Sequence, residues 1–247
     1  MLIKGFSSLG SFILVGIFST YALASSSVIG TVKFEGQAPH HRAINMEADA
    51  ICLAAHKDAV YPQTFLIGEG NTLGNVFVYV KSGDQLEIPG KRGLTKMDYP
   101  APTEPAILNQ KGCDYAPHVL GVMVGQKVKF LNTDGTLHNV HGMCKVNPEF
   151  NAAMPNVIKE MEKVFNKPEF MFPVRCDVHP WMVAWMAVMS HPFFTVTTID
   201  GQFEIKNLPA GTYEIEAWHE KLGTKTATII VKDGANQTID FTFSSPQ

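Results

Sequence analysis

Two short stretches of the chain carry side-chain types that bind a soft metal ion. Cys176, His179 and Met182 lie within residues 176–182, and His138 lies upstream within residues 138–141. One thiolate, two imidazoles and one thioether form the ligand set of a trigonal copper site that exchanges single electrons. If these four side chains converge, the folded chain carries one electron at a time on one copper ion.

The spacing of these residues has a mechanical reason. A strand that ends at Cys176 would deliver the sulfur, and a tight loop would return His179 and Met182 to the same point. Pro180 lies inside this loop and restricts its backbone. Zinc is the rival metal because cysteine and histidine bind it too. A thioether is a poor zinc ligand, so Met182 favours copper.

The segments that must position these ligands are predicted to be strands. Val, Ile, Phe, Tyr and Thr recur with a period of two residues between clusters of Gly, Pro, Asn and Asp, which is typical of strands and turns. The expected strands cover residues 28–34, 75–81, 119–124, 127–131, 170–175, 183–189, 194–198, 202–205, 212–218, 225–231 and 237–243. The last of these is expected to be a half-buried strand of an antiparallel sandwich. The sequence therefore predicts an all-β fold.

One segment is expected to differ from this pattern. Ile158, Met161, Glu162 and Phe165 would lie on one face of a short helix.

The candidate ligand loop resembles that of a known family. Residues 176–182 are similar to the ligand loop of the cupredoxins. The two residues between His179 and Met182 match the spacing in amicyanin, and residues 138–141 resemble the first-ligand motif of the same group. The resemblance covers residues 105–192 and implies a Greek-key β-sandwich with one mononuclear type 1 copper site. It implies that His138, Cys176, His179 and Met182 are the copper ligands. Electrons would then pass through the edge of His179 to a redox protein partner, such as a c-type cytochrome or a dehydrogenase.

A second resemblance covers most of the remaining chain. Residues 200–203 and 208–213 look like part of a carboxypeptidase regulatory-like (transthyretin-like) β-sandwich, which often opens with a Gly-x-Val strand such as residues 30–34. Because the opening strand lies far upstream, we expect an insertion. Residues 26–104 would begin this sandwich, residues 105–192 would form the cupredoxin domain, and residues 193–247 would complete the sandwich. Exported bacterial proteins of this arrangement are sometimes labelled methylamine-utilisation or plastocyanin-like.

The cysteine count leaves one thiol over. If Cys176 binds copper, Cys52, Cys113 and Cys144 remain. Cys113 lies just before an expected strand, and Cys52 lies in an N-terminal segment that needs tethering. We therefore expect a Cys52–Cys113 disulfide, which leaves Cys144 free or paired elsewhere.

Several other side chains compete with the expected ligands. His118 and His141 are nearby imidazoles, interpreted as structural or as supports of the metal ligands. Met186 and Met189 could replace Met182 at the axial position, or they could fill the core. Trp181 suits an exposed apolar patch around an electron-exit histidine, and it suits a core position equally well.

The N-terminus is expected to be an export signal over residues 1–24. Lys4 supplies the positive charge, residues 12–18 supply an apolar core, and residues 22–24 form a small-x-small cleavage site. The apolar core is too short to span a bilayer. We therefore expect a periplasmic or otherwise exported protein without membrane insertion.

Composition and motifs narrow the function further. The net charge of −3 shows no basic excess for binding phosphates, which argues against a nucleic-acid partner. The sequence contains no Ser-His-Asp order, no phosphate-binding glycine loop and no zinc-protease helix motif, so we do not expect an enzyme. The expected function is single-electron transfer by an exported copper protein. The alternatives are a copper-binding or delivery protein without redox turnover, and a structural or interaction module.

Overall fold

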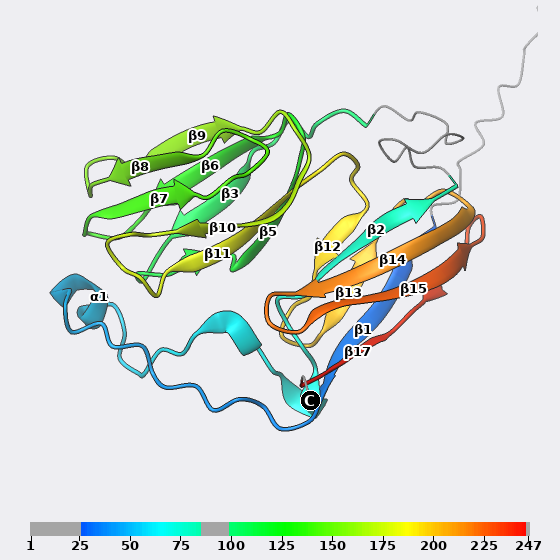
Figure 1. Ribbon diagram of the computed structural model, residues 1–247, viewed down its shortest axis with the longest axis horizontal. Helices are drawn as coiled ribbons and strands as arrows, with labels where there is room; N and C mark the ends of the chain where they lie inside the picture. Colours follow the sequence, from blue (N-terminus) through cyan, green and yellow to red (C-terminus); the bar gives the residue numbers. More distant parts are fainter. Residues whose placement is uncertain (1–25, 85–98, 246–247) are drawn as a thin grey trace, which may run out of the picture.

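The computed structural model describes residues 26–84 and 99–245, so the expected export signal lies outside the described residues. Strands are the main regular structure of the described residues and form four sheets, so the predicted all-β class is confirmed. Figure 1 shows these sheets as two sandwiches side by side. We call the sandwich built from residues 106–189 the middle sandwich, and the one built from both ends of the chain the terminal sandwich.

The middle sandwich consists of two sheets with the strand orders β5-β11-β10-β7-β8 and β4-β3-β6-β9. Its strands are β3 (Ala106–Gln110), β4 (Tyr115–Ala116), β5 (Val119–Met123), β6 (Lys127–Asn132), β7 (His138–Gly142), β8 (Phe150–Met154), β9 (Glu160–Val164), β10 (Glu169–Arg175) and β11 (Val183–Met189). Alternate side chains of both sheets point inward and form one apolar core, which includes Leu108, Phe130 and Phe172.

The terminal sandwich also has two sheets. One has the order β13-β1-β16 with β17 also paired to β1, and the other has the order β12-β2-β14-β15. Its strands are β1 (Val28–Glu35), β2 (Phe77–Gly83), β12 (Phe194–Val196), β13 (Gln202–Ile205), β14 (Gly211–His219), β15 (Gly223–Val231), β16 (Gln237–Thr238) and β17 (Phe241–Ser244). Its strands therefore come from residues 28–83 and 194–244. The predicted domain boundaries at residues 104/105 and 192/193 stay a prediction.

Two expectations about single elements are wrong. The segment expected to be a helix contains strand β9, which pairs with β6. Glu160 and Glu162 form cross-strand ion pairs with Lys129 and Lys127, so this polar edge strand is stabilised by its charges and lacks the apolar alternation that marks other strands.

The last expected strand is also different. Residues 237–243 are divided between β16 and β17, and both pair with β1 in parallel rather than antiparallel. Phe241 and Phe243 are buried, as the alternation in the sequence predicted.

The two sandwiches are packed together through strand β2. Its residues alternate between two buried environments: Val78 and Val80 face the core of the terminal sandwich, whereas Phe77 and Tyr79 pack against residues of β5 and β11. A Cβ atom on Gly121 of β5 would lie 2.6 Å from the ring of Phe77, so only glycine permits this close approach. The middle sandwich is therefore held in a fixed position against the terminal one.

A long connection carries the N-terminal part of the chain from one sandwich to the other. After β1, the chain runs along the bottom of the view in Figure 1 to helix α1 (Ala50–Ala54) at one end of the middle sandwich. It returns to β2 through the short 3-10 helices η1 (Gln63–Phe65) and η2 (Glu69–Asn71). The predicted Cys52–Cys113 disulfide is confirmed and attaches α1 to the middle sandwich, while Cys144 is free.

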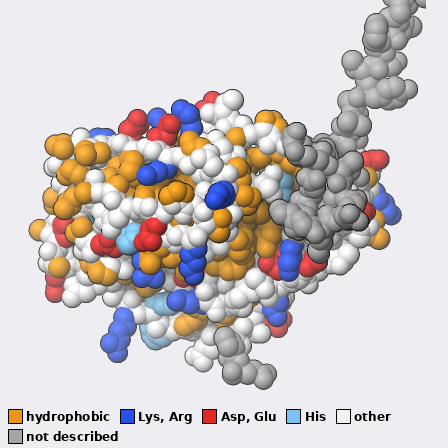
Figure 2. Space-filling view, turned by 45° about the horizontal axis from the view of Figure 1, so that its top comes forward, with side chains coloured by type: hydrophobic (Ala, Val, Ile, Leu, Met, Phe, Trp, Pro, Cys, Tyr) orange, Lys and Arg blue, Asp and Glu red, His pale blue; other side chains and the backbone are white. Residues whose placement is uncertain are grey.

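The surface adds little that points to a charged partner. On the face shown in Figure 2, acidic and basic side chains are interspersed among apolar ones. Within residues 26–84 and 99–245, no helix combines the length and the apolar character needed to cross a membrane.

His219 makes the fold sensitive to acid. This residue ends β14, its side chain is buried beside the rings of Phe65 and Phe243, and burial lowers the pKa of its imidazole to about 4. The unfolded chain binds a proton below about pH 6.5, and the folded chain binds it only near pH 4. His219 therefore contributes stability above pH 6.5 that is lost as the pH falls toward 4.

We expect the free energy of unfolding to fall by about 2 kcal/mol between pH 7.5 and pH 5 through His219 alone. Urea unfolding at both pH values measures this loss. Between these pH values, the free energy of unfolding of His219→Gln should fall by about 2 kcal/mol less than that of the wild type. His40→Gln, at an exposed position, should show the same fall as the wild type. An equal loss in His219→Gln and wild type would contradict this assignment.

Candidate metal centre

Three of the four predicted ligand side chains meet at one end of the middle sandwich. His138 begins β7, Cys176 follows the end of β10, and β10 pairs with both β7 and β11, so these positions lie close together. The Nδ1 atoms of His138 and His179 are 3.0 Å apart. The Sγ atom of Cys176 lies 3.9 Å from Nδ1 of His138 and 3.7 Å from Nδ1 of His179.

This triangle has the size that a bound metal ion requires. A point equidistant from three atoms with these separations lies about 2.1 Å from each, which is close to the usual metal–nitrogen and metal–sulfur lengths of about 2.0–2.3 Å. Among the described residues, the triangle of His138, Cys176 and His179 has three strong donors. A structural zinc ion takes four, whereas three strong donors and one weak axial ligand suit copper.

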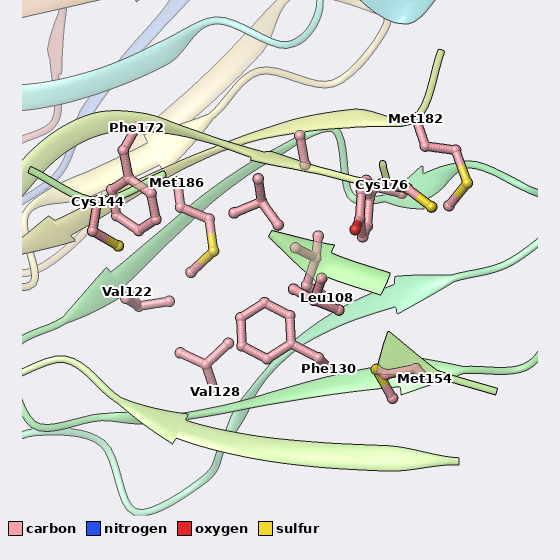
Figure 3. Close-up of a cluster of buried hydrophobic side chains, with 14 of the residues drawn as sticks. Leu108, Val122, Val128, Phe130, Cys144, Met154, Phe172, Cys176, Met182 and Met186 are labelled. Carbon is pink, nitrogen blue, oxygen red and sulfur yellow. The ribbon is translucent and has the colours of Figure 1, made fainter. Parts of the chain in front are cut away.

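Met182 is the thioether nearest to this triangle along the chain. The Cys176 N–H donates to the carbonyl oxygen of Met182, and the Met182 N–H donates to that of His179, so the loop closes on itself. Met182 is fully buried, and Figure 3 shows its sulfur and that of Cys176 at the same end of the core.

The competing methionines lie elsewhere. Met186 and Met189 are four and seven residues farther along, and a strand advances about 3.3 Å per residue, which places them roughly 13 and 23 Å from Met182. Figure 3 shows Met186 beside Cys144, away from Cys176. Of these three methionines, Met182 is the one that lies at the same end of the core as Cys176.

The electrostatics of the site prepare the cysteine to bind a metal ion. Burial raises the pKa of the Cys176 thiol. The hydrogen bonds to His138 and to neighbouring backbone groups lower it by a larger amount, so the net pKa is below the usual value. Burial lowers the pKa of His138, but Asp134 and Cys176 together raise it to about 9. In the metal-free site His138 is therefore an imidazolium at neutral pH. The lowered pKa of Cys176 favours the thiolate, which is the form that binds metal.

His179 is held in its neutral form. Burial lowers the pKa of its imidazole, the nearby Asp49 opposes this shift, and the charge of His138 adds to it, so the net pKa is below the usual value. A neutral imidazole keeps a lone pair for a metal ion.

Two carboxylates hold the two imidazoles from behind. His138 donates from Nε2 to Asp134 at 2.9 Å, and His179 donates from Nε2 to Asp49 at 3.2 Å. In both rings this leaves Nδ1 facing the triangle. Carboxylates placed in this way orient metal-binding imidazoles and increase their basicity.

The disulfide connects these two supports. Asp134 accepts a hydrogen bond from the backbone N–H of Cys113, and Asp49 accepts one from that of Cys52. Because Cys52 and Cys113 are bonded to each other, the two carboxylates are held in one covalently closed frame around the imidazoles.

Asn139 fixes the ligand loop to strand β7. Its side-chain oxygen accepts the backbone N–H of Asp177 at 2.6 Å, and its amide nitrogen donates to the Asp177 carboxylate at 3.1 Å. The residue after the first imidazole therefore positions the residue after the thiolate.

The other residues considered in the sequence are not part of the triangle. His118 is hydrogen-bonded to Glu220 of the terminal sandwich at 2.5 Å. His141 is hydrogen-bonded to both Asp177 and Glu149. Trp181 is partly buried and donates to the carbonyl oxygen of Cys113.

The edge of His179 through which electrons were expected to pass is covered. The residue is 2% exposed, because Asp49 and the Cys52 sulfur, which lies 3.5 Å from its Nε2, cover its outer side. The connection between β1 and β2, which includes Asp49 and Cys52, therefore closes this edge.

Sequence reasoning missed Asp49, Asp134 and Asn139. Asn139 had a signal in its position directly after His138, and Asp134 lies between the expected strand 127–131 and that histidine. Asp49 had no comparable signal, since it lies 130 residues from the histidine that it supports.

No known family profile matches the chain, and no curated protein matches it. Among solved structures, the copper-containing nitrite reductase of Thermus scotoductus SA-01 is 21% identical over 42% of this chain and 25% of its own, with a TM-score of 0.32. An amicyanin mutant in its Cu(I) form is 20% identical over 34% of this chain and 82% of its own, with a TM-score of 0.31. The purple cupredoxin of Nitrosopumilus maritimus is 24% identical over 34% of this chain and 99% of its own, with a TM-score of 0.29.

These similar structures are cupredoxins or contain copper by description, but each alignment covers less than half of this chain. The interpretation of the site therefore rests on its own geometry.

Replacing the support of His138 should weaken metal binding. In Asp134→Asn the carboxylate charge behind the imidazole is lost, and we expect copper affinity to fall by about 10- to 100-fold. Competition with a chelator of known affinity measures this change. Asp233→Asn, at an exposed loop position, is the matched control. Equal affinities of the two variants would contradict the role of Asp134.

The disulfide should stabilise the whole fold. It closes a loop with a sequence separation of 61 residues, and the chain-entropy estimate for such a loop is about 4 kcal/mol. We expect a Cys52→Ser/Cys113→Ser double variant to lose about that much free energy of unfolding, as measured with urea. A loss below about 1 kcal/mol would show that the connection contributes little.

Proposed function

We propose that this chain is an exported mononuclear copper protein that transfers single electrons. His138, Cys176 and His179 would hold the ion, and Met182 would be the fourth, weaker ligand. A copper ion in this position supplies one-electron chemistry by alternating between its cupric and cuprous states. The observation that carries the proposal is the buried triangle of two imidazole nitrogens and one sulfur.

The burial of the site separates electron transfer from other chemistry. His138, Cys176, His179 and Met182 are 0%, 1%, 2% and 0% exposed. A substrate needs room beside the reacting atoms, whereas an electron crosses a closed protein shell. The arrangement of Cys176, His138 and Asp134 could activate a nucleophile, but the sulfur is inaccessible to any substrate in this structure. Burial therefore favours an electron carrier over an enzyme.

The surrounding residues give the site its rigidity. Each imidazole is bonded to a carboxylate on its outer side, and the ligand loop is closed by its own backbone and held by Asn139. Electron transfer is fast when the ligands move little between the two oxidation states. These contacts support a site whose ligands keep their positions.

We propose a redox protein as the partner, such as a c-type cytochrome or a dehydrogenase. Leu137 and Val178 directly precede the two histidines and are 44% and 47% exposed. Exposed apolar side chains beside a buried redox site suit brief contact with another protein.

A copper-delivery role is less well supported. Delivery requires ligands that an acceptor protein can reach, and the four side chains are buried beneath a segment held by a disulfide. No described feature favours delivery over electron transfer.

The proposal predicts a blue copper protein. After addition of one equivalent of Cu(II), we expect an intense charge-transfer band from Cys176 and reversible one-electron reduction. Cys176→Ser should abolish the band, and Cys144→Ser should leave it unchanged, because Cys144 is the other free thiol and lies away from the site. Absorption and paramagnetic-resonance spectra measure both. Copper-loaded wild-type protein without the band, or Cys176→Ser with an unchanged band, would contradict the proposal.

A further inference from the structure

Asp49 covers the outer side of His179, although it belongs to the part of the chain that connects two strands of the terminal sandwich. Asp49 lies on the connection between β1 and β2, which belong to the terminal sandwich, and Figure 1 shows that α1 lies at the end of the middle sandwich. Its Oδ2 atom accepts a hydrogen bond from Nε2 of His179 at 3.2 Å.

Asp49 itself is firmly held. It is the N-cap of α1, and its Oδ1 atom accepts the backbone N–H groups of Ile51 at 2.8 Å and Cys52 at 3.1 Å. Its Oδ2 atom also accepts the hydroxyl of Thr136, which lies on the middle sandwich, at 2.8 Å. The Cys52–Cys113 disulfide fixes the helix to the same sandwich. The carboxylate therefore has one oxygen directed into its own helix and one directed to the imidazole.

We propose that Asp49 is a positioning residue of the metal centre, which orients the ring of His179, covers its outer edge and lowers the reduction potential of the bound copper. This inference rests on the proposed function and extends it, because it makes the terminal part of the chain a component of the site.

The geometry accounts for the first two effects. A ring that donates from Nε2 to a fixed carboxylate keeps its Nδ1 atom directed at Cys176 and His138, and it cannot turn outward without breaking that bond. With Asp49 and Cys52 against it, the ring is 2% exposed, so water has little access to the nitrogen.

The charge accounts for the third effect. A negative charge near the copper stabilises the cupric state relative to the cuprous state, which carries one positive charge less. The separation is one imidazole ring, and the Asp49 side chain is 19% exposed, so solvent screens the interaction only in part.

Two substitutions test the role of Asp49. Asp49→Asn loses the charge and keeps one side-chain oxygen, which can cap α1 or accept the imidazole proton but cannot do both. We expect this variant to have a more positive reduction potential than the wild type. Asp49→Ala loses both features, so its spectrum should change and its copper should pass to a chelator about 10- to 100-fold faster.

The matched control is Asp58→Asn. Asp58 lies on the same connection, is exposed, and undergoes the same loss of charge without contact with His179. Its potential and its rate of copper loss should match those of the wild type. The inference would be overturned if Asp49→Asn had the same reduction potential as Asp58→Asn. It would also be overturned if Asp49→Ala had the same spectrum and the same rate of copper loss as Asp58→Asn.

A measurement on the unaltered protein covers the case in which a variant does not fold. In the diamagnetic Cu(I)-loaded wild type, nitrogen–proton correlation spectra should show the Nε2 proton of His179 with slow exchange with water. Rapid exchange, as for an exposed imidazole, would overturn the inference. Wild-type protein that takes up no copper would overturn both the proposed function and this extension. Copper uptake with a failed Asp49 test would overturn the extension alone.

Discussion

The organisation of the site depends on two imidazole rings that are each held from behind by a carboxylate. In both rings the Nε2 atom is engaged and the Nδ1 atom faces Cys176. Because the two carboxylates accept backbone N–H groups from Cys52 and Cys113, the disulfide defines the distance between the supports. The Nδ1 atoms of the two rings are also hydrogen-bonded to each other at 3.0 Å, so the carboxylates and this contact together keep the arrangement.

The frame also explains why a site in the middle sandwich needs the N-terminal connection. Strands β7, β10 and β11 deliver the ligands, but they leave the outer side of His179 uncovered. Helix α1 reaches that side from the terminal sandwich and brings Asp49 and Cys52 with it. The buried interface around Phe77 and Tyr79 holds the two sandwiches against each other, so the connection spans a constant distance. A closed site of this kind suits the transfer of electrons rather than the handling of a substrate.

Local patterns predicted the ligand loop and most strands because those signals are short in range. Cys176, His179 and Met182 lie within one loop, and strands such as β11 and β13 have the bounds that alternation indicated. The polar strand β9 was interpreted as a helix, because its side chains are stabilised by ion pairs with β6 and not by a buried face. The parallel pairing of β16 and β17 with β1 is set by contacts between the two ends of the chain, which periodicity does not report. Asp49 was missed for the same reason.

The most direct test is X-ray absorption at the copper edge of the protein loaded with one equivalent of copper. The account predicts two nitrogen ligands near 2.0 Å and one sulfur ligand near 2.3 Å, because the three donor atoms already surround a point about 2.1 Å from each. A shell of oxygen and nitrogen ligands without sulfur would contradict it.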